Sequence, residues 1–239
     1  MQAGEGVLLS LLMAEPSKFK SGGGCLSKLL LLILLVAAGG LGAAIFYTIQ
    51  PQDLGDLTAA KPLPERDLKV VLKNAAERGY PVTLSEAEIN QWLGRTLVTK
   101  QAGFLEGKVT LDRVWVRLEN ERAEVIMERH FLGKPFTVSM YFKVEKLEDI
   151  KGRLTDFQPN GGPYLKDFPH PPKGGRFGKL VVPMGFLYLV LPAYQKLGGL
   201  FPEEVDLAFT NMTRVKIEKG NLILDPREPL GEEGMPKTF

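Results

Sequence analysis

Cysteine and histidine are scarce in this sequence, and their scarcity limits the chemistry that it can support. The 239 residues contain one cysteine, Cys25, and two histidines, His130 and His170. A lone cysteine excludes a disulfide framework and a cysteine-rich metal site. The histidines lie far apart along the chain and lack the spacing of metal ligands. We therefore expect no metal and no cofactor.

An excess of charge of one sign is also absent. The chain has 30 lysines and arginines against 28 aspartates and glutamates, for a formal net charge of +2. Proteins that bind nucleic acid through its phosphates need a strong basic surplus, so we expect no nucleic-acid partner. The hydrophobic fraction of 44% and the charged fraction of 24% are those of a folded protein.

The motifs of the common enzyme classes are missing as well. The sequence has no G-x-S-x-G elbow, no P-loop, no H-E-x-x-H and no G-x-G-x-x-G. The acidic pairs 86/88 and 203/204 fall at expected helix starts, where negative charge is favoured anyway. We predict no catalytic residue and a protein that is not an enzyme. An envelope enzyme with an unrecognised active site is the alternative.

One long hydrophobic run is present, from Leu29 to Ile49, and it carries no charge. As a helix it would match a hydrocarbon core of roughly 30 Å. Lys18, Lys20 and Lys28 precede the run, so the positive-inside rule places the N-terminus in the cytoplasm and the rest outside it. We expect a single-pass signal anchor in the cell membrane. A cleaved signal peptide is the alternative.

This run divides the chain into five regions. We expect a cytoplasmic leader at 1–28, a transmembrane helix at 29–49, a linker at 50–64, an extracytoplasmic domain at 65–225 and a flexible tail at 226–239. Within the leader, Met13 is a second candidate for the start of translation.

Two amphipathic helices open the outer domain. Apolar residues recur with helical spacing over 68–76, and Gly79 stands where the first helix should stop. Ser85 and Glu88 then form a capping box that opens a second helix.

Asn90 lies at the edge of the apolar stripe of the second helix. Asparagine is mildly disfavoured inside helices, which suggests that its side chain has a bonding role. We expect Asn90 to be a structural polar residue that hydrogen-bonds the backbone of a neighbouring loop, the alternative being a plain surface amide.

From Gly107 the hydrophobic period changes from 3.6 residues to 2, which predicts antiparallel strands. A phase change near 112–113 predicts a β-bulge. The region 159–178, rich in glycine and proline, predicts a long loop. The expected strands are 109–118, 123–132, 136–145 and 150–157 in a meander, followed by 205–209 and 212–218 paired with 221–224.

The segment 180–195 is uncharged and too short to span a membrane. We expect a helix that starts at Pro183 and is broken at Pro192. One side of this helix would line a groove for an acyl chain or the membrane surface; ordinary core is the alternative. The candidate ligand-facing residues are Phe186, Leu187, Val190 and Leu191.

Two segments resemble the YpmS-like family of bacterial proteins. They are VTLSEAEINQWL at 82–93 and FGKLVVP at 177–183, the latter followed by an apolar helix and the hairpin TRVKIEKGNLILDP. The resemblance follows the order of elements over most of 65–225, on short motifs. It implies one N-terminal span and an outer domain of unknown function. The family pattern has counterparts at Thr83, Glu86 or Glu88, Asn90, Leu93, Gly178, Lys179, Leu180 and Pro183.

The sequence as a whole predicts an α+β protein. We expect an N-terminal transmembrane helix followed by an extracytoplasmic domain in which a curved antiparallel sheet packs on two or three helices. This layout looks like that of lipid-handling proteins in which a curled sheet wraps an apolar helix. The expected function is binding or scaffolding at the lipid bilayer, with a lipid or another apolar molecule as ligand. An accessory subunit that recognises a membrane-protein partner through small residues of its span is a further alternative.

Overall fold

The computed structural model describes residues 25–59, 61–101, 110–131, 133–149, 152–162, 172–218 and 220–227. It divides into two compact units, Met1–Ala43 and Ala44–Phe239. The first 24 residues with Met13, Lys18 and Lys20, the second histidine His170, and residues 228–239 lie outside the described residues.

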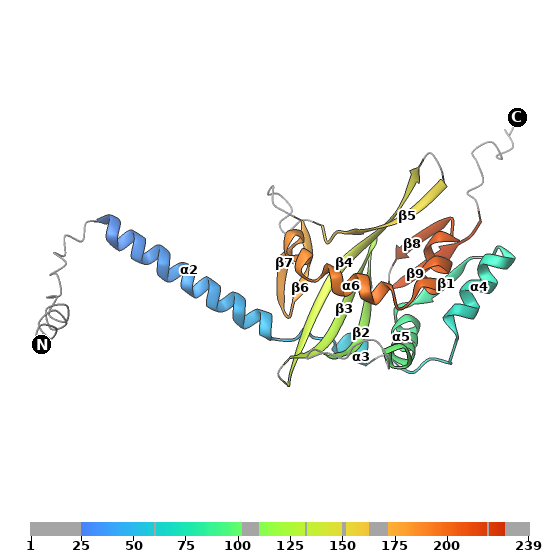
Figure 1. The fold of residues 1–239 in the computed structure, drawn as a ribbon, viewed down its shortest axis with the longest axis horizontal. Helices are drawn as coiled ribbons and strands as arrows, with labels where there is room; N and C mark the ends of the chain where they lie inside the picture. Colours follow the sequence, from blue (N-terminus) through green and yellow to red (C-terminus); the bar gives the residue numbers. More distant parts are fainter. Residues whose placement is uncertain are drawn as a thin grey trace, which may run out of the picture. The chain divides into compact units, whose positions relative to one another are not determined.

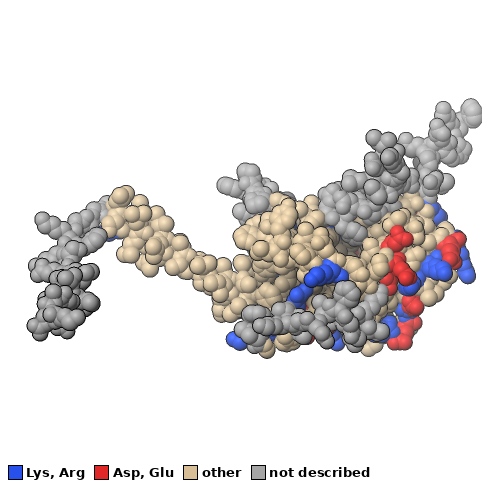
Figure 2. Space-filling view, viewed as in Figure 1, with Lys and Arg blue, Asp and Glu red and all other residues tan. Residues whose placement is uncertain are grey.

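The first described element is α2 (Cys25–Ile49), an apolar helix. Its residues Leu26–Ile49 are long and apolar enough to cross a membrane by length and composition. Leucines over most of its length remain exposed, and Figure 2 shows a nearly continuous tan rod. The helix begins four residues before Leu29, at Cys25.

The main sheet is antiparallel and has the strand order β2-β3-β4-β6-β7, with β5 paired to the second half of β4 (Figure 1). Four of these strands, β2 to β5, lie within a few residues of the bounds expected from the sequence. The strands are β2 (Thr110–Glu119), β3 (Arg122–Phe131), β4 (Lys134–Asp149), β5 (Gly152–Pro159), β6 (Lys173–Phe177) and β7 (Leu180–Pro183).

The expected bulge in the first strand is confirmed. The register of β2 on β3 shifts between Leu111 and Arg113. Because one extra residue is inserted there, both Leu111 and Val114 reach the same hydrophobic core despite their odd spacing.

The expectation of a continuous loop over 159–178 is wrong for its last part, which forms β6. Gly175 explains why this glycine-rich stretch can join the sheet. A Cβ at this position would lie 1.9 Å from the carbonyl oxygen of Ser139 on β4, so only glycine allows the two backbones to approach this closely.

The two expected amphipathic helices are present as α4 (Leu68–Arg78) and α5 (Glu86–Gln101). Gly79 ends α4 in the left-handed region, at φ 67°. At the start of α5, the Ser85 backbone N–H donates to Glu88 Oε2 at 2.9 Å and the Glu88 N–H donates to Ser85 Oγ at 3.3 Å. This is the expected capping box.

A second sheet, which the sequence did not reveal, has the order β1-β9-β8. The hairpin of β8 with β9 was expected, whereas the pairing of β1 with β9 joins segments far apart in sequence. The strand expected over 205–209 is wrong, because this stretch is helical. The elements are β1 (Val82–Ser85), α7 (Pro202–Val205), η2 (Asp206–Thr210), β8 (Arg214–Glu218) and β9 (Asn221–Asp225).

The single helix expected from Pro183 is also wrong. The chain instead forms a 3₁₀ segment, η1 (Met184–Leu189), followed by α6 (Leu191–Gly198). Pro192 lies in the first turn of α6, where its missing N–H costs nothing, but it could not continue a helix that began at Pro183.

The two faces of the main sheet bury different kinds of side chain. One face carries the apolar residues of β2, β3 and β4 and packs against residues of α5 and α6. The other face is polar along β4, yet it too is buried, with Thr137, Ser139 and Tyr141 between 0% and 2% exposed. The segment after α2, which includes α3 (Gly55–Thr58), contacts this face through Gln52 and Leu57.

Candidate functional site

The apolar face of the main sheet borders a cavity of about 520 Å³. This volume lies within the range of small-molecule sites in proteins. Its walls come from both sheets, from α4, α5 and α6, and from the α7–η2 segment. All of these elements belong to the unit 44–239.

Three strands supply the floor of the cavity through alternate residues, in register across the sheet. Val116 on β2 pairs with Val125 on β3, and Ala123 on β3 pairs with Phe142 on β4. These four side chains line the cavity, although each remains partly accessible. Side chains in a filled core would be fully buried, so the elements that pack on this face do not completely cover these four residues.

The opposite wall is equally apolar. Ile89, Trp92 and Leu93 come from α5 through helical spacing, while Leu191 and Leu197 come from α6. The Trp92 ring lies 5.5 Å from the ring of Phe201, centroid to centroid, and so forms part of an aromatic wall. Apolar surface left open in this way is worth about 25 cal/mol per Å² to any apolar ligand that covers it.

Tyr194 limits the cavity at one side and is fixed there by its hydroxyl group. The Tyr194 Oη lies 2.9 Å from the Val125 carbonyl oxygen and 3.0 Å from that of Val138. Burial, together with the negative charge of Glu124, raises the pKa of Tyr194 well above its ordinary value. The neutral hydroxyl therefore serves as a hydrogen-bond donor to the sheet and not as an acid or base.

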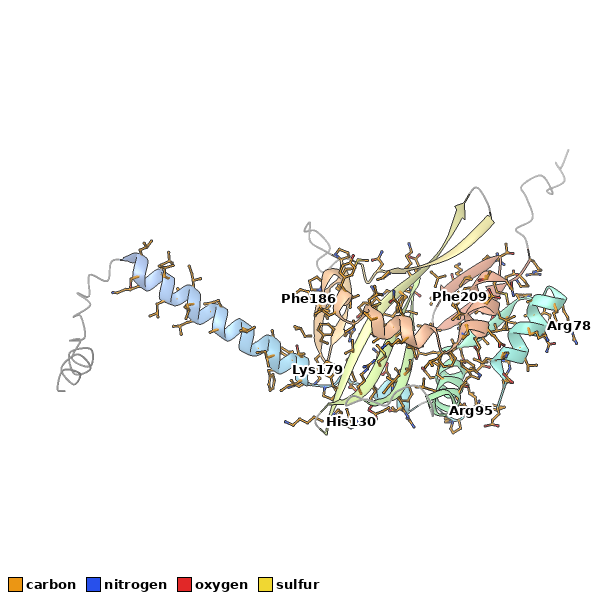
Figure 3. All side chains as sticks on the ribbon, viewed as in Figure 1. Arg78, Arg95, His130, Lys179, Phe186 and Phe209 are labelled. Atoms are coloured by element: carbon orange, nitrogen blue, oxygen red, sulfur yellow. The ribbon has the colours of Figure 1, made fainter. Side chains whose placement is uncertain are left out.

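The charged and amide side chains among the lining residues lie at its margin. Gln195 is exposed and Glu204 is half-buried, beside the exposed apolar side chain of Val205. Figure 3 labels Phe209, another lining residue, on the side of the molecule that carries β8. Among the described residues, the cavity thus combines an apolar interior with a polar rim.

The four residues predicted to face a ligand do not form one surface. Leu191 lines this cavity and Val190 lines a second pocket. Leu187 is 3% exposed and belongs to the core, whereas Phe186 is 53% exposed at the surface. The break between η1 and α6 turns these residues in different directions, which spacing on one continuous helix could not reveal.

Asn90 forms two hydrogen bonds with the backbone of Val116 on β2, a strand rather than the loop that we expected. Its Nδ2 donates to the Val116 carbonyl oxygen at 2.8 Å, and the Val116 N–H donates to its Oδ1 at 2.6 Å. One helical turn earlier, Glu86 accepts from the Leu118 N–H at 2.7 Å. Residues four apart on a helix have nearly the same spacing as residues two apart on a strand. The side chains of α5 can therefore satisfy backbone hydrogen-bonding groups of β2, at the free edge of the sheet.

Replacing Asn90 with leucine should therefore lower the free energy of unfolding by about 1–3 kcal/mol, because both polar groups of Val116 lose their partner. Thermal unfolding measures the change. The matched substitution Asn74→Leu, at a half-buried asparagine of α4, should change stability by about 0.5 kcal/mol or less. Equal effects of the two substitutions would show that the Asn90 bonds contribute nothing.

The polar face of the sheet holds a buried charged network that the sequence did not indicate. Glu124 is 0% exposed, and its Oε1 accepts from Ser139 Oγ at 2.6 Å while its Oε2 lies 2.9 Å from Arg117 Nη1. Burial opposes the charge of Arg117, but its hydrogen bonds to Asp56 and the charge of Glu124 outweigh burial and raise its pKa. Gln52 joins the network through Ser139 Oγ at 3.1 Å. These contacts hold the segment after α2 against the sheet.

The described residues contain no group of three or more histidine, cysteine, aspartate or glutamate side chains that could hold a metal ion. His130 pairs with Asp112, the Nδ1–Oδ2 distance being 2.6 Å, at the surface of the sheet. His170 and its surroundings lie outside the described residues.

Comparisons with protein-family models, with curated proteins and with solved structures each give no match.

Proposed function

We propose that this chain is a membrane-anchored binding protein whose extracytoplasmic domain holds an apolar ligand, the acyl chain of a lipid, without catalysing a reaction. The observation that carries the proposal is the cavity of about 520 Å³ with partly accessible apolar side chains on both walls. In this proposal the main sheet is curved around the ligand and α5 and α6 cover it, as in the layout that the sequence suggested.

The chemistry of the walls favours an alkyl chain over a polar molecule. Val116, Val125 and Phe142 offer contact surface but no hydrogen bond, and Tyr194 already donates its proton to the backbone. Binding sites for polar molecules place a few polar groups where they converge on the ligand. The proposal includes membership of the YpmS-like family, with which a binding protein anchored by one N-terminal span is compatible.

Quenching of Trp92 fluorescence tests the proposal directly, because the chain has two tryptophans and only Trp92 lines the cavity. In the full chain carrying Trp115→Phe, a fatty acid brominated at mid-chain should quench the remaining tryptophan in a saturable manner. In the matched variant Trp92→Phe, the remaining Trp115 lies on the other face of the sheet and should not be quenched. Equal quenching in the two variants would refute binding in the cavity.

The proposed orientation of α2 has its own test. A reporter that is active only outside the cytoplasm should be active when fused after residue 60, and a reporter active only in the cytoplasm should be inactive there. The expectation rests on Lys28 and the other lysines before the apolar run, and on Asp53 and Asp56 after it. The opposite pair of results would reverse both the orientation and the proposed location of the domain.

A further inference from the structure

A second pocket, of about 500 Å³, lies on the same face of the main sheet. On β3, Ala123 and Val125 line the cavity, and the next residues of the same face, Met127 and Arg129, line the second pocket. The α6 segment lies between the two, since Leu191 and Tyr194 line the cavity while Ala193 lines the second pocket. The pocket is therefore a separate site.

Arg129 is the unusual feature of this pocket. It is half-buried, and its hydrogen-bonding contact is to the sulfur of Met127, with Nη2 at 3.5 Å. Within the described part of the chain, no carboxylate lies within ion-pair distance of Arg129, in contrast to the half-buried Arg117 and Arg176, which both contact Glu124. Burial lowers the pKa of Arg129, which reflects this missing counter-charge.

A guanidinium group has five N–H donors, and it is costly to bury it without acceptors. Among the described residues that line the pocket, none supplies an acceptor that could replace a carboxylate, since the others are apolar residues and a second cation, Lys134. Lys134 is the first residue of β4, directly after the turn of the β3–β4 hairpin. Two cations in an apolar pocket are complementary to an anionic group attached to an apolar body.

The position of the pocket indicates where such a molecule would come from. Ile49, the last residue of the apolar helix α2, is one of its lining residues. Leu189 also lines it and is 76% exposed, as is its neighbour Tyr188. Figure 3 places Phe186 and Lys179 at one end of the domain and Arg78 at the opposite end. Exposed apolar side chains beside the end of a membrane span are suited to the interface of a bilayer.

We propose that the second pocket binds the headgroup of an anionic membrane phospholipid. Arg129 and Lys134 bind its phosphate, and Phe136 and Leu189 contact the glycerol and the start of the acyl chains. A guanidinium favours phosphate because two of its N–H groups can bind two oxygens at once. This site does not depend on the ligand proposed for the cavity, although both would take lipid.

Native mass spectrometry of the full chain in detergent tests the site, with phosphatidylglycerol or phosphatidylcholine added at equal concentration. The unmodified chain should retain phosphatidylglycerol at least about fivefold more than phosphatidylcholine. Arg129→Gln should reduce this ratio to about one, whereas the control Arg78→Gln, an exposed arginine at the other end of the domain, should leave it unchanged. Equal retention of the two lipids by the unmodified chain, or an unchanged ratio in Arg129→Gln, would overturn the proposal.

Two further measurements distinguish a phospholipid site from a structural arginine and from a site for free phosphate. The midpoint of thermal unfolding should not fall in Arg129→Gln, because the substitution removes an unpaired cation. A fall with loss of both lipids would mean that Arg129 is structural and would overturn the proposal. Millimolar inorganic phosphate should not displace phosphatidylglycerol, and displacement would identify a site for free phosphate instead. Quenching of Trp92 by the brominated fatty acid should be the same in Arg129→Gln, so a failure of the cavity proposal would be detected separately.

Discussion

Replacing Glu124 with leucine should lower the free energy of unfolding by about 3–5 kcal/mol. The carboxylate is fully buried and contacts two guanidinium groups, with Oε2–Nη1 of Arg117 at 2.9 Å and Oε1–Nε of Arg176 at 3.4 Å. Without it, Arg176 has the Tyr141 hydroxyl as its remaining polar contact among the described residues, and a half-buried charge without a counter-charge is destabilising. Chemical denaturation of the full chain in detergent measures the loss.

The matched control is Glu77→Leu. Glu77 pairs with Lys73 on the exposed face of α4 at 3.8 Å, so its removal should change stability by about 0.5 kcal/mol or less. A loss below about 1 kcal/mol for Glu124→Leu would contradict the view that this network holds the segment after α2 against the sheet.

The second large effect is expected from filling the cavity. Ala123→Phe adds an aromatic ring opposite Phe142, in the space that the acyl chain would occupy. Affinity for the brominated fatty acid, measured by quenching of Trp92, should fall at least about tenfold, equivalent to about 1.4 kcal/mol. Stability should change little by comparison, because the ring enters a space that is open and apolar.

Val116→Phe places a ring in the same space from β2 and should lower the affinity for the fatty acid equally. The second variant shows that the loss does not arise from a folding defect specific to position 123. Ala59→Phe adds the same ring at an exposed site after α3 and should leave affinity unchanged. Affinity that survives both cavity substitutions would place the ligand elsewhere.

The elements that follow from local patterns could be predicted from the sequence. Alternation of apolar residues predicts a strand, and the phase change near Asp112 predicts the bulge, because both depend only on neighbouring residues. Capping of α5 by Ser85 and Glu88 is local as well. The pairing of β1 with β9 could not be predicted in the same way, because it depends on contacts between distant segments.

The polar face of β4 shows a different limit. Alternation of Thr137, Ser139 and Tyr141 with apolar residues suggests a strand with one face in water. In the structure this face is buried: the Gln52 N–H donates to Thr137, Ser139 donates to the buried Glu124, and Leu57 packs on the neighbouring strands β2 and β3. Whether a polar face meets water or a buried charge depends on what packs there, and the sequence pattern is the same in both cases.

The position of the cavity could not be predicted from the sequence. An apolar site was expected along 180–195, with ordinary core as the alternative, yet most of the residues that line the cavity come from other elements, among them Val116, Ala123 and Trp92. These residues have the sequence pattern of ordinary core. Only the spacing between the elements in three dimensions determines whether such residues pack against each other or leave a space.

Native mass spectrometry of the unmodified full chain, purified in mild detergent, tests the central claim most directly. The spectrum should show the chain carrying bound lipid after excess detergent and free lipid are removed. Ala123→Phe should carry one lipid fewer per chain, and Ala59→Phe should match the unmodified protein. A chain that carries no lipid, or an Ala123→Phe variant with the same lipid content as the unmodified chain, would contradict the proposal that the cavity holds an acyl chain.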